Sequence, residues 1–142
     1  MNTIKPIFKD KNVLIVDDSI VRGTTSTQLI QLAKSAGAKK IYFASAAPIV
    51  KYPNVYGIDI PTSKELIANN KNEIEIAKII GADKIFYNDL QDVIESCLSS
   101  IPQNDTNKYC GAKEFETSCF NGDYITVNID TEFLDELELK RK

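Results

Sequence analysis

The sequence predicts an α/β protein in which a parallel sheet is flanked by helices. Apolar runs of strand length alternate with amphipathic segments of helix length, which is typical of a doubly wound sheet. Residues 13–16 are all apolar, as expected of an interior strand that is covered on both faces. Asp17 and Asp18 follow at the carboxyl end of this strand, where open α/β sheets bind their ligands.

The elements that follow the strand at 13–17 are a helix and a second strand. Residues 24–36 are predicted to form the helix, because apolar residues recur at helical spacing and Gly37 can end it. The side chains that we expect to face inward are Leu29, Ile30, Leu32 and Ala33. The second strand is predicted at about 40–46. The prolines that indicate an extended connection after it are Pro48, Pro53 and Pro61.

Two candidate capping boxes mark the next helix starts. Thr62 and Glu65 predict a short helix that ends near Ala68. Asn72 and Glu75 repeat the pattern at the start of a second helix, which we expect to stop at the next glycine.

The last strand is predicted at 84–87 and the helix after it at 89–98. Apolar residues recur along one face of this helix, and we expect that face to be buried. They are Leu90, Val93, Ile94, Cys97 and Leu98. We therefore interpret Cys97 as a core residue rather than as a metal or redox site.

The end of the chain is more polar. Residues 99–116 contain a proline and a glycine and are predicted to form a loop. Residues 130–142 carry apolar residues at helical spacing, so we expect a helix there with Asp130 as a candidate cap.

Composition and charge exclude several classes of partner. The 142 residues carry a net charge of -3 with interspersed signs, so no concentrated basic surface is available for nucleic acid or membranes. No apolar run is long enough to span a membrane, and the first residues lack the apolar core of a secretory signal. Three widely spaced cysteines do not make a disulfide framework. We therefore expect a globular protein of the reducing cytoplasm, without nucleic-acid or membrane partners.

The loop after the first strand has the composition of a site for a phosphorylated sugar. Asp17 and Asp18 can accept hydrogen bonds from vicinal hydroxyls or help to hold Mg²⁺. Behind them, Gly23 permits an unusual backbone angle and a close approach to a ligand. The hydroxyls of residues 24–26 and the free amides of a helix start can bind a phosphate.

Residues 13–26 resemble the signature with which type I phosphoribosyltransferases bind phosphoribosyl pyrophosphate (PRPP). The variant Asp-Asp-Ser-Ile-Val-Arg-Gly-Thr-Thr-Ser resembles that of the glutamine PRPP amidotransferase family. The resemblance continues through residues 36–42, 44–48, 52–59, 65–68, 80–83 and 119–124. The candidate substrate-binding residues that it implies are Asp17, Asp18, Ser19, Arg22, Gly23, Thr24, Thr25 and Ser26. Asp17 and Asp18 are also the candidate Mg²⁺ ligands.

The resemblance implies a partial type I phosphoribosyltransferase fold and an activity. The family converts PRPP, glutamine and water into 5-phosphoribosylamine, glutamate and pyrophosphate in purine biosynthesis. It further implies PRPP and purine nucleotides as ligands, Mg²⁺ as the cofactor, and a homo-oligomer for the full-length enzyme. Residues 1–100 are expected to be the carboxyl-terminal part of the transferase domain, and residues 101–142 a loop and a tail.

The glutamine-hydrolysing domain of the family has no counterpart in this sequence. No cysteine precedes Cys97, and no segment supplies the first strands of the transferase sheet. We therefore expect a carboxyl-terminal fragment that carries no catalytic residue and is inactive alone. A second hypothesis is a PRPP-binding or nucleotide-binding module with a regulatory role.

One branch of the family holds an iron–sulfur cluster through cysteines. This sequence has Asn54 where that branch uses a cysteine, and only Cys110 and Cys119 occur in the late segment. Two thiolates cannot supply the usual four ligands, so we expect no cluster. Because the chain lacks histidine, we do not expect a structural zinc site either.

A receiver-type signalling domain is the main rival interpretation, since such domains also open with a strand and an acidic pair. Asp59 lies at a plausible distance to imitate their phosphate-accepting aspartate. The Gly-Thr-Thr turn has no function in a receiver, however, and the Lys-Pro pair that a receiver requires near its end is absent. Two alternatives stay open: the acids and Gly23 can be purely structural, and Arg22 can bind phosphate or pair with an acidic residue.

Overall fold

The computed structural model describes residues 5–100, 114–126, 129 and 131–140. The strands are β1 (Asn12–Asp17), β2 (Lys40–Ser45) and β3 (Lys84–Tyr87). The helices are α1 (Lys5–Phe8), α2 (Thr24–Ser35), α3 (Glu73–Ile80), α4 (Leu90–Ser99), α5 (Ser118–Asn121) and α6 (Thr131–Lys140), and a 3-10 turn η1 covers Ser63–Glu65. The predictions for all three strands and for α2, α3 and α4 are confirmed to within one residue at each end. Helices α1 and α5 were not predicted from the sequence.

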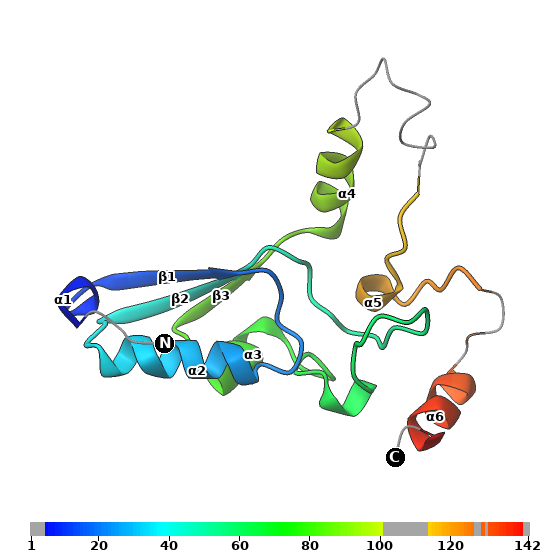
Figure 1. Cartoon of the computed structure of the whole chain (residues 1–142), viewed down its shortest axis with the longest axis horizontal. Helices are drawn as coiled ribbons and strands as arrows, with labels where there is room; N and C mark the ends of the chain where they lie inside the picture. The colour runs from blue at the N-terminus through cyan, green and yellow to red at the C-terminus, as the bar shows by residue number, and fades with distance from the viewer. Residues whose placement is uncertain (1–4, 101–113, 127–128, 130, 141–142) are drawn as a thin grey trace.

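The three strands form one parallel sheet in the order β1-β2-β3. Figure 1 shows α2 and α3 together on one side of this sheet. Ile30 of α2 and Ile76 of α3 are completely buried in one core with Phe43 of β2. Burying an apolar side chain of this size stabilises a fold by about 1.5–3 kcal/mol. This layer therefore fixes the sheet and the loops at its carboxyl edge.

The opposite face of the sheet is open in the part of the chain that the structure describes. Leu14 and Val16 of β1 are 57% and 67% exposed, and Phe86 of β3 is 43% exposed. β1 also lies at the edge of the sheet. The prediction of an interior strand covered on both faces is therefore wrong for these residues, because no described element packs against this face or edge.

Asp89 caps the start of helix α4, since its carboxylate accepts hydrogen bonds from the N–H groups of Gln91 and Asp92 at 2.8 and 3.4 Å. No residue of α4 is buried, and Cys97 is exposed. The prediction of a core Cys97 is therefore wrong. The apolar residues have the expected spacing, but α4 rises away from the end of β3 on the side of the sheet opposite α2 and α3 (Figure 1).

A second, smaller core joins the connection after β2 to α5. The residues buried in it are Val50, Ile60, Leu66 and Cys119. The backbone N–H groups of Lys51 and Tyr52 donate to the Cys119 carbonyl at 2.9 and 3.1 Å, which ties the late segment to this connection.

Asn54 is fully buried in the connection after β2. Its Oδ1 accepts hydrogen bonds from the N–H groups of Tyr56 and Ile58 at 2.8 and 3.1 Å. Its Nδ2 donates to Glu116 Oε2 at 3.5 Å. The side chain at this position therefore organises the turn around residue 57.

The two predicted capping boxes had different outcomes. At α3, the Asn72 side chain accepts from Glu75 N at 3.0 Å and the Glu75 carboxylate accepts from Asn72 N at 2.8 Å, which confirms the box. Thr62 makes no cap; its hydroxyl donates to the Glu65 carboxylate at 3.2 Å. The predicted helix up to Ala68 is wrong, because Leu66 adopts an extended conformation that places it in the second core.

The predicted tail helix is confirmed as α6, while its candidate cap Asp130 lies outside the described residues. Residues 114–117 are irregular, as the loop prediction requires, and residues 101–113 with Cys110 also lie outside the described part. In the described ranges, no helix combines the length and the apolar character needed to cross a membrane.

Candidate functional site

The candidate loop, residues 17–26, lies at the carboxyl edge of the sheet. Asp17 ends β1 directly beside Ser45, the last residue of β2. The carbonyls of Asp17 and Asp18 accept hydrogen bonds from the N–H groups of Ala46 and Ala47 at 2.9 and 2.8 Å. These bonds extend the pairing of the strands beyond the sheet, so the acidic pair has a fixed backbone.

The two carboxylates are accessible to a ligand. Asp17 is half-buried and Asp18 is exposed. Asp17 Oδ1 accepts a hydrogen bond from Asp18 N at 3.1 Å, and Asp18 Oδ1 accepts one from the Ser19 hydroxyl at 3.0 Å. These local bonds orient both carboxylates, and an ionised carboxylate has about four acceptor positions, so each retains capacity for ligand hydroxyls or a cation.

Two apolar residues hold the middle of the loop. Ile20 is 2% exposed in the main core, and Val21 packs against the second core. The Val21 carbonyl also accepts a hydrogen bond from Ile67 N at 2.9 Å. The loop is therefore anchored in both cores, while the acidic pair on one side of this anchor and the threonines on the other stay accessible.

Gly23 is required by both its conformation and its surroundings. Its φ is 78°, in the left-handed region that favours glycine. A Cβ atom there would overlap Ile67 Cδ1 and lie 3.3 Å from Ile80 Cγ2. Its carbonyl accepts from both Thr27 N and the Thr27 hydroxyl, at 2.9 and 2.7 Å, which starts α2.

The start of α2 has the properties of an anion site. No side chain caps this end, and the first turn contains no acidic residue. Thr24 and Thr25 are accessible at the surface, whereas Ser26 is only 2% exposed. The backbone N–H groups of a helix start attract anions. The structure therefore leaves the two threonine hydroxyls open to a ligand, while the Ser26 side chain is buried in the protein.

Arg22 forms an ion pair with Glu65. Its Nε lies 3.0 Å from Glu65 Oε2, and both side chains are about half exposed, at 48% and 49%. Of the alternatives left open by the sequence, the structure shows pairing with an acidic residue. Because the pair is exposed, it is worth only about 0–1 kcal/mol, so a phosphate could replace Glu65 as the partner of Arg22.

Sequence reasoning missed the neighbours that the fold brings to this edge. Glu65 belongs to the 3-10 turn, and nothing in its local pattern points to Arg22. Asn88, after β3, donates from Nδ2 to the Ala46 carbonyl at 3.2 Å. Asn88 could have been identified from its place directly after the strand predicted at 84–87, because the carboxyl ends of parallel strands meet at one edge of a sheet.

The residues present fit one kind of metal ion. Within the described ranges, no three His, Cys, Asp or Glu side chains gather closely enough to enclose a metal. Mg²⁺ does not need such a cage, because it keeps several waters and is commonly held by one or two carboxylates together with substrate phosphates. Asp17 and Asp18 match that donor set. Cys119 is a poor thiolate ligand, because burial and the nearby Glu116 raise the pKa of its thiol.

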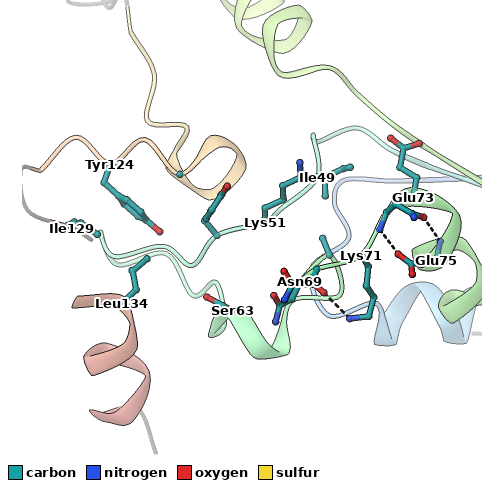
Figure 2. A pocket seen from close by; sticks show the side chains of 15 residues that line it. Ile49, Lys51, Ser63, Asn69, Lys71, Glu73, Glu75, Tyr124, Ile129 and Leu134 are labelled. Atoms are coloured by element: carbon teal, nitrogen blue, oxygen red, sulfur yellow. Dashed lines mark hydrogen bonds between the residues drawn. The ribbon is translucent and has the colours of Figure 1, made fainter. Parts of the chain in front are cut away.

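A separate pocket of about 1080 Å³ lies between the connection after β2, the start of α3 and the late segment. Figure 2 shows Lys51, Asn69 and Lys71 on one side of it and Tyr124 and Leu134 on the other. None of residues 17–26 lines it. The pocket is therefore distinct from the candidate loop.

Two tyrosines outside the loop have raised pKa values. Burial raises the pKa of Tyr87 to about 12, with a further contribution from Glu73. Burial also raises the pKa of Tyr124 to about 12, and neighbouring acidic groups add to it. Tyr124 donates its hydroxyl hydrogen to the Pro53 carbonyl at 2.7 Å, whereas the Tyr87 hydroxyl finds no partner in the described structure. Both groups are neutral at physiological pH, so neither supplies charge for ligand binding.

The comparisons with known proteins give a consistent picture. No protein-family model matches the chain. An amidophosphoribosyltransferase of Haemophilus influenzae is 53% identical over 141 residues, which are 99% of this chain and 26% of that protein. The chain therefore spans about a quarter of the length of this relative.

Two solved structures resemble the fold. One is glutamine PRPP amidotransferase from B. subtilis in complex with ADP and GMP, with a TM-score of 0.67 and 34% identity over 88% of this chain and 26% of that one. The other is described as the allosteric regulatory enzyme of purine biosynthesis, with a TM-score of 0.71 and 32% identity over 96% of this chain and 28% of that one. The prediction of a partial type I phosphoribosyltransferase fold is confirmed.

Proposed function

Because the chain is related over nearly its whole length to the carboxyl-terminal part of the amidophosphoribosyltransferases, we propose that residues 17–26 are the PRPP-binding loop of such an enzyme. The observation that carries this proposal is the juxtaposition of two accessible carboxylates and an uncapped helix start at one end of a parallel sheet. PRPP requires both kinds of group, because its ribose presents hydroxyls and its 5′ end presents a phosphate.

Each part of the loop has a defined task in this proposal. Asp17 and Asp18 accept hydrogen bonds from the ribose hydroxyls. The N–H groups at the start of α2 and the hydroxyls of Thr24 and Thr25 bind the 5′-phosphate. Gly23 brings the backbone close enough for this contact, and Arg22 supplies positive charge once it leaves Glu65. Ser19 orients Asp18, and Ser26 contributes its N–H group rather than its buried side chain.

Mg²⁺ is proposed as the cofactor, with Asp17 and Asp18 as its protein ligands. When bound, it neutralises the pyrophosphate of PRPP and so assists the departure of that group from C1. The protein's own contribution is to position the ribose and to stabilise the positive character that develops on the ring during substitution. The carboxylates lie at the carboxyl edge of the sheet, a position that suits both Mg²⁺ binding and positioning of the ribose.

The proposed reaction of the complete enzyme is conversion of PRPP, glutamine and water to 5-phosphoribosylamine, glutamate and pyrophosphate. This chain would supply the ribose-phosphate site, and the rest of the enzyme would supply ammonia from glutamine. We therefore propose that these 142 residues alone have negligible activity. The proposal also includes a cytoplasmic location and, for the complete enzyme, a homo-oligomer.

A regulatory function of the same loop is supported by one specific observation. The B. subtilis relative was solved with ADP and GMP. A purine nucleoside monophosphate carries a ribose and a 5′-phosphate, so it offers the loop the same two groups as PRPP. We propose that such nucleotides compete with PRPP for residues 17–26.

A calorimetric titration with PRPP and Mg²⁺ tests the proposed function. The double variant Asp17→Asn with Asp18→Asn should weaken binding by about 10-fold to 100-fold, since two charge-assisted hydrogen bonds become neutral. Asp59→Asn is the matched control, because it removes an exposed carboxylate outside the loop. GMP should reduce the apparent affinity for PRPP. Equal affinities for the double variant and the wild type would remove the acids from the site.

A further inference from the structure

The three strands end in one row, and hydrogen bonds link the segments that follow them. Asp17, Ser45 and Tyr87 lie side by side at the ends of β1, β2 and β3. β2 lies between the other two strands, so the segment after it can contact both neighbours. The first residues after the three strands are Asp18, Ala46 and Asn88.

Asn88 is joined to Asp18 through the peptide group between Ala46 and Ala47. The Asn88 Nδ2 donates to the Ala46 carbonyl at 3.2 Å. The N–H of the same peptide group, which belongs to Ala47, donates to the Asp18 carbonyl at 2.8 Å. A peptide group that accepts a hydrogen bond at its carbonyl donates more strongly from its N–H. The amide side chain after β3 therefore supports the bond that holds Asp18 after β1.

The Asn88 side chain is itself fixed in orientation. Its Oδ1 accepts a hydrogen bond from Asp89 N at 3.1 Å, so the amide nitrogen is the atom that faces Ala46. Asp89 is fixed in turn as the cap of α4. Asn88 needs both a donor and an acceptor for these two bonds, and an ionised aspartate or a leucine of similar size lacks the donor.

The segment 46–47 also sets the direction of a carboxylate. The Ala46 N–H donates to the Asp17 carbonyl at 2.9 Å. The N–H of that peptide group, which belongs to Asp18, donates to Asp17 Oδ1 at 3.1 Å. Groups that hold the ligands of a metal in direction raise its affinity, although they do not touch the metal. A fixed segment 46–47 therefore favours binding by the acidic pair.

We infer that Asn88 is a positioning residue for the acidic pair, which it holds through segment 46–47 rather than by contact with the ligand. This inference rests on the proposed function of Asp17 and Asp18 as the groups that bind the ribose and Mg²⁺. Asn88 is exposed, so water can satisfy the Ala46 carbonyl when the amide is removed, but water does not fix its position. Loss of the amide should therefore change ligand affinity more than stability.

The test compares Asn88→Ala with Asn121→Ala by calorimetry on the 142-residue chain. Asn121 is the matched control, because it is also exposed, donates from Nδ2 to Thr117 Oγ1 at 3.1 Å and accepts from Asp123 N at 2.9 Å. Asn88→Ala should weaken binding of PRPP with Mg²⁺ by about threefold to tenfold. Inorganic phosphate needs only the start of α2, so its affinity should stay unchanged. Asn121→Ala should change neither affinity.

Two further measurements separate positioning from a general loss of structure. In the Asp17→Asn with Asp18→Asn background, Asn88→Ala should weaken PRPP binding by less than about twofold, because the groups through which it acts have lost their charge. Amide hydrogen exchange of Ala47 should become about threefold faster or more in Asn88→Ala, and stay unchanged in Asn121→Ala.

The outcomes distinguish a failure of this inference from a failure of the proposed function. Unchanged PRPP affinity in Asn88→Ala, an equal loss of PRPP and phosphate affinity, or an unchanged exchange rate of Ala47 would each overturn the inference alone. If the Asp17→Asn with Asp18→Asn variant binds PRPP as tightly as the wild type, the proposed function fails and the inference fails with it.

Discussion

Arg22 Nε lies 3.0 Å from Glu65 Oε2, although the two residues are 43 positions apart in the sequence. The pair places a carboxylate against the one arginine of the candidate loop and leaves that arginine about half exposed. Glu65 is fixed in turn by the Thr62 hydroxyl, which donates to its other carboxylate oxygen at 3.2 Å. If the loop binds a phosphate as proposed, this carboxylate competes with the phosphate for Arg22.

Replacing Glu65 should therefore strengthen binding of a phosphorylated ligand. In Glu65→Gln, we expect the affinity for PRPP to rise by about twofold to fivefold at low salt, because Arg22 is released and one negative charge is lost. Glu95→Gln on α4 removes the same charge outside the loop and should change the affinity little. Calorimetry at two salt concentrations measures both effects. A weaker affinity in Glu65→Gln would show that Glu65 assists binding instead.

Gly23 should tolerate substitution worse than another glycine with positive φ. Gly23→Ala is expected to lower the free energy of unfolding by about 2–4 kcal/mol, from left-handed strain and overlap with Ile67. Gly57 has a φ of 97°, but a Cβ atom added there would meet nothing within 4 Å beyond its chain neighbours, so Gly57→Ala should cost about 1–2 kcal/mol. Urea titrations of both variants give the comparison. Equal losses would contradict the importance of Ile67.

The two tyrosines with raised pKa values should respond differently to loss of their hydroxyl groups at neutral pH. Tyr124→Phe removes a hydrogen bond to the Pro53 carbonyl and should cost about 1 kcal/mol. Tyr87→Phe removes a buried hydroxyl without a partner in the described structure, so stability should stay equal or rise. Thermal unfolding at pH 7 measures both, and a larger loss for Tyr87→Phe would refute the assignment.

Alkaline pH should destabilise the wild type through the same two groups. The unfolded chain ionises tyrosine near pH 10, while the folded chain keeps Tyr87 and Tyr124 neutral up to about pH 12. The unfolded state therefore releases protons first, and stability is full below pH 10 and falls as the pH rises to about 12. Urea midpoints at pH 8 and pH 11 should show a smaller loss for either Tyr→Phe variant than for the wild type.

The sequence predicted those parts of the fold that depend on local chemistry. Helix α3 begins at the capping box of Asn72 and Glu75, and both α2 and α3 end just before a glycine. The bounds of these helices could therefore be predicted. The position of the acidic pair was predictable for the same reason, because it follows a strand directly. Whether Arg22 pairs with an acidic residue could not be predicted from the sequence, because its partner Glu65 is brought to it only by the fold.

The wrong predictions concern side chains whose environment lies elsewhere in space. Cys97, Leu14 and Val16 have apolar patterns that indicate burial, but in the described chain no element covers them. Leu66 is extended rather than helical, because burying its side chain in the second core stabilises the fold more than one further turn of helix would. Patterns of this kind show that a residue needs a partner, and they do not show whether the same chain supplies it.

The most direct test of the central claim is an amide NMR titration of the isotope-labelled chain with PRPP and Mg²⁺. If residues 17–26 hold the ligand, the largest shift changes should fall on the amides of Asp18, Thr24, Thr25 and Ser26, and they should disappear in the Asp17→Asn with Asp18→Asn variant. Changes confined to residues around Lys51 and Lys71, in the separate pocket, would contradict the account.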